Sequence, residues 1–235
     1  MNDKVGGPSL DEVVTLAAAH GLAFRGAFHP EAGDGVLPLP DGATPGTVAL
    51  LGFVGGRSWP AFAASPELGD GRPDPLDRWS RRVVEGLAAA LGAMPLLPFG
   101  GPPWLPFQRW AMKAEAVYPS PTGMLIHPDW GLWHGYRGAL AFREALALPP
   151  RDPRASPCES CAGKPCLAAC PVGAFTPDGY DVAACAGHLA TPAGRDCMER
   201  SCRARRACPV GAELAYGREQ SAFHMRAFRA ARVAR

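Results

Sequence analysis

The sequence predicts an α+β domain followed by a small cysteine-rich domain. Residues 1–157 alternate helix-like and strand-like segments and contain no cysteine, whereas all eight cysteines lie between Cys158 and Cys208. The stretch ALPPRDPRASP at 147–157 is rich in proline and polar residues, which is typical of a linker. A chain of 235 residues is long enough for two small domains. We therefore expect one domain over residues 1–150 and a second over residues 151–235.

The first domain opens with a predicted helix and two predicted strands. Apolar residues recur at helical spacing in LDEVVTLAAAH, at 10–20. Two strands are expected next, from the alternation in GLAFRGAFHP at 21–30 and the apolar run TVALLGFVGG at 47–56. The clearest helix covers 73–92, because Pro75 suits a helix start, Asp77 its positive end and Gly92 its stop.

A helix is also expected at 106–118, followed at 123–142 by strand-like pieces around an HPDWG turn. Residues 86–107 form an uncharged run of 22 residues, but five prolines would break a membrane helix repeatedly. We therefore expect no membrane span, but a helix end followed by a buried extended segment. The C-terminal stretch 221–235 predicts a basic amphipathic helix that packs Phe223 and Phe228 on the body.

The cysteines are expected to be reduced. The N-terminal stretch MNDKVGGPSLDEVV lacks the basic and then apolar pattern of a secretion signal, so we expect a cytoplasmic protein. Reducing compartments disfavour a disulfide framework, and clustered reduced thiols favour a metal.

The cysteines form two groups and one isolated residue. The first group is closed by Pro171 and consists of Cys158, Cys161, Cys166 and Cys170. Cys185 stands alone, and the last group is closed by Pro209 and consists of Cys197, Cys202 and Cys208. The string CPVGA occurs at 170–174 and again at 208–212, each time at the last cysteine of its group. This repetition indicates an internal duplication.

Two metals are compatible with this number of thiols. Structural zinc would use them as two sites of four thiolates. Zinc ribbons usually separate two tight pairs, however, whereas the first four cysteines here arrive consecutively and end in Cys-Pro. We therefore place iron–sulfur clusters ahead of zinc, and disulfides last.

The pattern resembles the ferredoxin domain that holds two [4Fe-4S] clusters, over roughly residues 155–213. Bacterial ferredoxins use C-x2-C-x2-C-x3-C-P, and the fourth cysteine binds the other cluster. This chain has two inserted residues before Cys166 and looser spacing in the last group. The resemblance implies one cluster held by Cys158, Cys161, Cys166 and Cys208. It implies a second held by Cys170, Cys185, Cys197 and Cys202.

The second domain is basic, with thirteen Lys and Arg against eight Asp and Glu from residue 151 onward. Two clusters with their thiolates would add a charge of about −4 and leave roughly +1. Aromatic residues do not alternate with the five arginines near the last cysteine group, so we favour charge compensation and expect no nucleic-acid partner. These residues are Arg195, Arg200, Arg203, Arg205 and Arg206. A solvated face and a docking site for an acidic redox partner are the alternatives.

The stretch GMLIHPDWGLWHGYRGALAF resembles an I-H-P-x-[FW]-G-x-W-x-x-x-R-G pattern of the cobalamin-processing decyanase family, whose domain has a nitroreductase-like α+β fold. The order of domains resembles that of epoxyqueuosine reductase, and reductive dehalogenases share it, although the signature around the reductase's catalytic acid is absent. The resemblance implies a pocket for cobalamin, or a flavin, in the first domain. Its candidate residues are His127, Trp130, Trp133 and Arg137.

Each of these four residues also has a structural interpretation. His127 precedes Pro128 and fits a turn histidine bonded to backbone. Trp130 and Trp133 fit core or interface aromatics, and Arg137 fits an ion pair with an acidic residue.

The sequence favours an iron–sulfur protein that relays single electrons through two [4Fe-4S] clusters to or from a redox partner protein. One alternative is a cobalamin-dependent reductase in which the clusters reduce a corrinoid in the first domain. Another is a zinc-stapled binding module. A Ser/His/Asp arrangement, a phosphate-binding glycine loop and an H-E-x-x-H motif are absent, which gives hydrolases little support.

Overall fold

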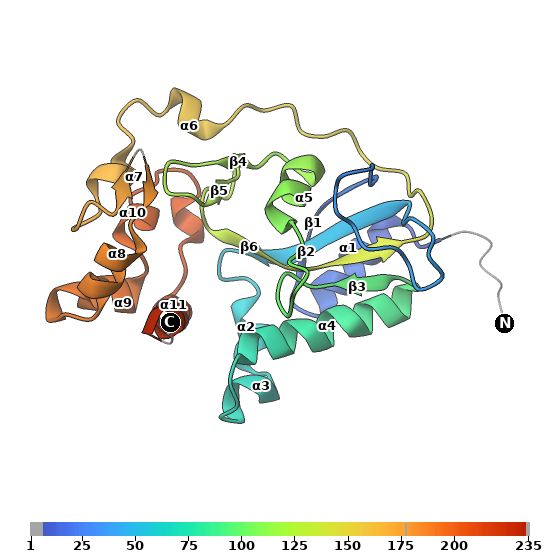
Figure 1. The fold of residues 1–235 in the computed structure, drawn as a ribbon, viewed down its shortest axis with the longest axis horizontal. Coiled ribbons are helices and arrows are strands. Elements are labelled where there is room, and N and C mark those ends of the chain that lie inside the picture. Colours follow the sequence, from blue (N-terminus) through green and yellow to red (C-terminus); the bar gives the residue numbers. More distant parts are fainter. Residues whose placement is uncertain (1–6, 177, 234–235) are drawn as a thin grey trace. The chain divides into compact units, whose positions relative to one another are not determined.

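The computed structural model describes residues 7–176 and 178–233 (Figure 1). Residues 1–6, which begin the stretch without a secretion signal, lie outside it. The fold is mixed α/β with a small sheet, and the chain divides into two compact units. The first takes the described residues up to Ala116 together with Gly135–Pro153. The second takes Val117–His134 and the described residues from Arg154 onward.

The domain boundary differs from the one predicted at residues 150 and 151. The chain does leave the first unit at Pro153, but 117–134 were expected in the first domain and belong to the second. Contacts of Arg154 give the reason: its guanidinium donates to the Asp129 carboxylate at 2.6 and 2.7 Å. Its carbonyl accepts a hydrogen bond from the Tyr118 hydroxyl. Residues 117–134 are thus bound to Arg154, at the start of the cysteine-rich segment.

The first unit is built on a four-stranded sheet with the order β1-β2-β6-β3. β1 and β2 pair antiparallel, as do β3 and β6. Every residue of β2 is buried, as its apolar sequence predicts. The strands are β1 (Ala23–Phe28), β2 (Thr47–Val54), β3 (Met94–Leu96) and β6 (His134–Phe142).

Helices cover this sheet. α1 (Leu10–Ala19) and α5 (Phe107–Ala114) pack against β1, and α4 (Pro75–Leu91) lies along β3 (Figure 1). Pro75 occupies the first turn of α4, and Gly92 ends it in a left-handed conformation with φ of 66°. The elements predicted at 10–20, 21–30, 47–56 and 73–92 are therefore confirmed, whereas the helix predicted at 106–118 ends at Ala114. Two short helices, α2 (Trp59–Ala63) and α3 (Pro66–Gly69), were not predicted.

The uncharged run 86–107 holds the end of α4, the short strand β3 and a loop that leads to α5. Among residues 7–176 and 178–233, no helix is both long and apolar enough to cross a membrane.

β1 and the end of α5 approach each other closely at Gly26. This glycine has φ of +84°, and a Cβ there would collide with the Ala114 carbonyl. The register of β1 against β2 shifts between Phe24 and Ala27, which is a bulge. The bulge and the glycine together bring Arg25 next to Glu115, the residue that follows α5.

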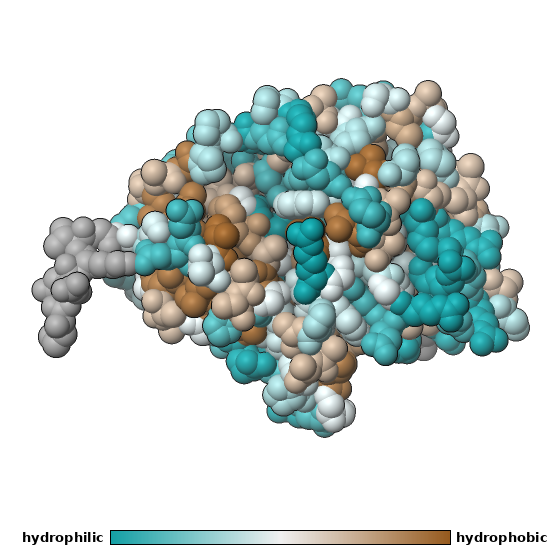
Figure 2. Space-filling model, turned by 180° about the vertical axis from the view of Figure 1, so that it is seen from behind, coloured by the Kyte–Doolittle hydropathy of each residue, from teal (hydrophilic) through white to brown (hydrophobic). Residues whose placement is uncertain are grey.

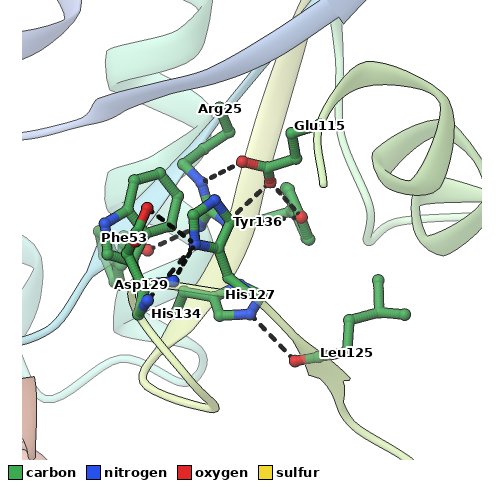
Figure 3. A network of polar contacts seen from close by, with 9 residues as sticks. Arg25, Phe53, Glu115, Leu125, His127, Asp129, His134 and Tyr136 are labelled. Carbon is green, nitrogen blue, oxygen red and sulfur yellow. Dashed lines mark hydrogen bonds and ion pairs between the residues drawn. The ribbon is translucent and has the colours of Figure 1, made fainter. Parts of the chain in front are cut away.

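A buried polar network follows from this approach (Figure 3). Arg25 is fully buried and donates from Nη2 to Glu115 Oε1 at 2.7 Å and from Nη1 to the Phe53 carbonyl at 2.9 Å. The Tyr136 hydroxyl also donates to Glu115. Burial raises the pKa of Glu115, while the Arg25 charge acts to lower it. Arg25 and Glu115 therefore form a buried ion pair that the sequence around either residue does not predict.

Apart from α11, the second unit consists of short elements. Its hairpins pair β4 (Tyr118–Pro119) with β5 (Leu125–Ile126) and β7 (Phe175–Thr176) with β8 (Gly179–Tyr180). The predicted C-terminal helix is present as α11, which begins earlier than expected and packs against α8 and α9. The helices are α6 (Pro157–Ser160), α7 (Pro165–Ala168), α8 (Val182–Leu189), α9 (Arg195–Arg200), α10 (Arg203–Arg206) and α11 (Arg218–Val233).

Candidate metal centres

Two cavities in the second unit divide the eight cysteines into two groups of four. A cavity of about 240 Å³ is lined by Cys158, Cys161, Cys166 and Cys208. A cavity of about 510 Å³ is lined by Cys170, Cys185, Cys197 and Cys202. The last cysteine of each sequence run therefore lies with the other run. All eight thiols are free, so no disulfide competes with this grouping.

Electrostatic coupling within the smaller cavity follows the same grouping. Burial raises the pKa of Cys158, and the nearby thiols of Cys208 and Cys166 raise it further. Burial likewise raises the pKa of Cys208, and Cys166 and Cys161 add to that effect. Cys208 also packs with Ile126 and Leu132 in a small apolar core, and this packing holds the cysteine in place.

Short proline-initiated turns place two of these cysteines. α6 and α7 each begin with a proline, which fixes φ for the first helical residue, and each places a cysteine directly after it. In α6 the Ser156 hydroxyl accepts from the Cys158 N–H at 3.3 Å. Lys164, before α7, donates from Nζ to the Cys158 carbonyl at 3.2 Å. The two turns are thereby held together around the first group.

The two CPVGA copies turn the backbone back toward the sulfur of their cysteine. Gly173 and Gly211 occupy equivalent places and have φ of +58° and +67°. In the first copy the Ala174 N–H donates to Cys170 Sγ at 3.3 Å. In the second copy the Val210 N–H acts to lower the pKa of Cys208. Amide donors of this kind stabilise the thiolate form that binds metal.

Cys185, the isolated cysteine of the sequence, lies on α8. The Asp181 carboxylate caps this helix by accepting from the Ala184 N–H at 2.9 Å. Burial raises the pKa of Cys185, a hydrogen bond from the Tyr180 hydroxyl acts to lower it, and Cys170 raises it further. Tyr180 is a candidate residue that sequence reasoning missed, because its position before α8 carries no motif.

His127 is a turn histidine. Its Nδ1 accepts from the backbone N–H groups of Asp129 at 3.0 Å and Trp130 at 3.3 Å. Two backbone donors on Nδ1 require a lone pair there, so in the neutral ring the proton sits on Nε2. The ring also stacks on Trp130, with 3.8 Å between centroids.

Trp133 belongs to the core of the second unit, with 1% of its surface exposed. Its ring meets Tyr216 edge-on at 5.2 Å. The Arg205 guanidinium lies over both rings, 4.5 Å from Trp133 and 4.4 Å from Tyr216, and donates to the Leu132 carbonyl. Arg205 therefore stabilises this core by cation–π contact.

Arg137 lies in the first unit, on β6. It donates to the Ser80 hydroxyl at 2.9 Å and to the Asp77 carboxylate near the start of α4. The four residues expected to bind a corrinoid or flavin are therefore not gathered in one unit. The structural interpretations fit His127, Trp133 and Arg137, while Trp130 is half-buried and stacks on His127.

The arginines near the last cysteine group are largely paired. Arg203 and Arg206 both donate to the Asp196 carboxylate, and Arg200 lies 3.7 Å from it. Arg195 donates to Glu199 at 2.6 Å. Asp196 and Glu199 thus neutralise much of this charge locally, and compensation of clusters stays a prediction.

Two glycines lock the HPDWG turn onto the second CPVGA copy. Gly131 has φ of +55°, and a Cβ there would collide with the Val210 carbonyl. Gly211 reciprocates, because its Cβ would lie 2.5 Å from the Trp130 carbonyl carbon. The backbones touch directly, and this contact holds the Cys208 loop in place.

We expect Gly131→Ala to lower the free energy of unfolding by about 3 kcal/mol, because the methyl group adds both left-handed strain and a backbone collision. Gly173→Ala is the matched control: it has the same sign of φ but nothing within 4 Å of the added Cβ. That variant should lose only about 1 kcal/mol. Urea unfolding measures both, and equal losses would show that the Gly131 contact is not tight.

Comparison with known proteins gives a likeness of fold. The chain matches no protein-family model and no curated protein. The structure of epoxyqueuosine reductase from Streptococcus thermophilus is 12% identical, with a TM-score of 0.49 over 88% of this chain and 67% of that one.

A crystal structure of epoxyqueuosine reductase with an epoxyqueuosine-modified tRNA-Tyr stem loop is 15% identical. Its TM-score is 0.51, and the match covers 91% of this chain and 68% of that one. The chain is thus similar in structure to epoxyqueuosine reductase at low sequence identity. Similarity at this level concerns the fold and does not carry an activity.

Proposed function

We propose that this chain is an iron–sulfur protein whose second unit binds two [4Fe-4S] clusters and exchanges single electrons with a redox partner protein. On this proposal the second unit is a two-cluster ferredoxin-type domain, joined to a nitroreductase-like first unit. The observation that carries the proposal is the crossed division of the cysteines, four to each cavity. Ferredoxin-type domains cross their ligands in this way.

The donor sets suit such clusters in kind and number. A [4Fe-4S] cluster takes four thiolates, one for each iron, so its ligands surround a cavity instead of meeting at one point. Among the described residues, no group of three or more His, Cys, Asp or Glu is arranged to hold a single metal ion. The smaller cavity would use Cys158, Cys161, Cys166 and Cys208, and the larger would use Cys170, Cys185, Cys197 and Cys202.

When bound, such clusters accept and release one electron at a time. The chain's own part is to hold the sulfurs and to set their electrostatic environment. The Ala174 amide donates a hydrogen bond to Cys170 Sγ, and the Tyr180 hydroxyl acts to lower the pKa of Cys185, both in the larger cavity. Such donors stabilise negative charge on sulfur and thereby favour the reduced state.

Metal analysis of protein purified without oxygen tests the proposal. We expect about eight irons per chain, a brown colour that bleaches on reduction, and an electron paramagnetic resonance signal in the reduced protein. Colourless protein with about two zinc ions per chain would instead establish the zinc-stapled module. Protein that binds neither metal would refute both.

A cobalamin-dependent reductase is the second candidate, supported by the likeness of fold to epoxyqueuosine reductase. His127 and Arg137 make structural contacts within the chain, and a corrinoid site beside them stays a proposal. An absorption spectrum after anaerobic addition of cobalamin decides it, because bands of free corrinoid alone would exclude binding.

The expected absence of a nucleic-acid partner loses support from the comparisons. A solved structure of similar fold contains a tRNA stem loop, although this likeness does not transfer the ligand. A nucleic-acid partner is therefore included among the outcomes of the docking experiment below.

A further inference from the structure

We propose that the mouth of the larger cavity and the outer face of α11 form a docking surface for a small acidic redox protein. The mouth consists of Val172 and Tyr180, and the arginine rim consists of Arg226 and Arg229. The inference rests on the proposed function and deepens it, because it names where electrons are exchanged and what kind of partner brings them.

The mouth is apolar and exposed. Val172 is 39% exposed and Tyr180 is 37% exposed, and both line the cavity that holds four thiols. The Tyr180 ring stacks on Phe175 at 4.9 Å, which fixes its position. Tyr180 and Cys185 line the same cavity. A partner that touches the Tyr180 ring is therefore one side chain away from the thiol group.

α11 forms one wall of the same cavity. Its inner face contributes His224, Met225 and Phe228 to the lining. The Phe228 ring lies 6.3 Å from Tyr180, so helix and mouth are continuous. An α-helix is only about 10 Å thick with its side chains. A protein bound on the outer face would therefore be separated from the cavity by a single helix.

The outer face of α11 carries positive charge. The helix has four arginines and one glutamate, and Arg226 and Arg229 are exposed, while Arg232 lies over the Phe228 ring. Among the described residues, none forms an ion pair with Arg226 or Arg229. Residues three apart on a helix lie side by side, so the two charges act together. Arg203 and Arg206, in contrast, are already bound to Asp196.

These features fit a protein partner of opposite charge. An apolar centre surrounded by arginines is the usual anatomy of a protein interface. Complementary charge accelerates encounter, and small interfaces are typical of transient redox complexes. Hydrophilic residues also cover this unit where α9 lies, and α9 packs against α11 (Figure 2). Single-stranded nucleic acids stack on several exposed aromatic side chains, whereas the mouth, Val172 and Tyr180, contains one aromatic residue.

The test uses the full chain with its clusters and a small acidic [2Fe-2S] ferredoxin as the probe. The charge-reversed variant is Arg226→Glu with Arg229→Glu, and its control is Arg57→Glu with Arg72→Glu. The control arginines are exposed in the first unit, so both variants change the net charge equally. We expect the rate of electron exchange with the ferredoxin to fall about tenfold or more in the rim variant and to lose its salt dependence. The control should keep the wild-type rate.

Calorimetry measures the affinity for oxidised ferredoxin, and this measurement needs no electron transfer. Unchanged affinity in the rim variant, or equal losses in both variants, would overturn the inference. If the rim variant instead loses binding of a tRNA stem loop while its ferredoxin affinity stays intact, the surface serves nucleic acid and the inference is wrong. Iron content and reduction by dithionite are measured first, so that a protein without clusters refutes the proposed function and not the docking surface.

Discussion

Replacing Cys166 and Cys208 together by alanine is expected to leave about half of the iron, near four atoms per chain. Replacing Cys166 and Cys170 together is expected to remove nearly all of it. Each variant loses two thiols, and the two variants differ only in which second cysteine is lost. The crossed grouping places Cys166 and Cys208 at one cavity but Cys170 at the other.

A sequential arrangement predicts the opposite result. If each run of cysteines in the sequence held its own cluster, Cys166 and Cys170 would share one, and Cys208 would belong to the other. The first variant would then lose both clusters and the second would keep one. Iron analysis together with the electron paramagnetic resonance signal of the reduced protein separates the two arrangements without knowledge of any substrate.

Folding must be checked in both variants, because an unfolded chain also loses its iron. Far-ultraviolet circular dichroism should be similar in the two, since the first unit contains no cysteine. A single replacement, Cys170→Ala, gives a further comparison: it should retain the cluster of the smaller cavity. Loss of all iron from every variant would leave the grouping unsupported.

The second large effect is expected at the buried ion pair of the first unit. Arg25→Met should lower the free energy of unfolding by about 3–5 kcal/mol, because it leaves the Glu115 carboxylate buried without its partner. The Arg25 side chain is fully buried and that of Glu115 is 10% exposed, so water cannot replace the lost contact. After this change the Tyr136 hydroxyl remains as a hydrogen-bond donor to Glu115.

The matched control is Arg81→Met, which removes an exposed ion pair with Glu85 on α4. That change should cost less than about 1 kcal/mol. The double variant Arg25→Met with Glu115→Leu should recover most of the loss, because replacing both members of a buried pair by apolar residues is often neutral. Urea unfolding measures all three. A loss at Arg25 no larger than at Arg81 would show that the buried pair is not isolated from water.

Much of the secondary structure was predictable because its signals are local. The helix at α4 was expected from Pro75, Gly92 and the spacing of its apolar residues, and the structure confirms it. The strand β2 was expected from an uninterrupted apolar run, and all of it is buried. Helices α2 and α3 were missed because five and four residues are too few to show a period.

The site was predictable in composition but not in arrangement. The number and spacing of the cysteines predicted metal binding, and only a resemblance suggested that their groups cross. Tyr180 was missed because a tyrosine beside a helix start has no distinctive pattern. The corrinoid residues show the reverse: they were expected from a resemblance in one stretch, and the structure places His127 in a turn and Trp133 in a core.

The sequence by itself determined the longer helices α1, α4 and α11, the strands β1 and β2, and the confinement of every thiol to one part of the chain, because each depends on neighbours within a few residues. Only the tertiary structure decided that 117–134 join the cysteine-rich unit and that Arg25 meets Glu115, ninety positions away. Such pairings depend on how distant segments close on one another. The bulge in β1, Gly26 and Arg25 fix this arrangement. None of them produces a periodic pattern in the sequence.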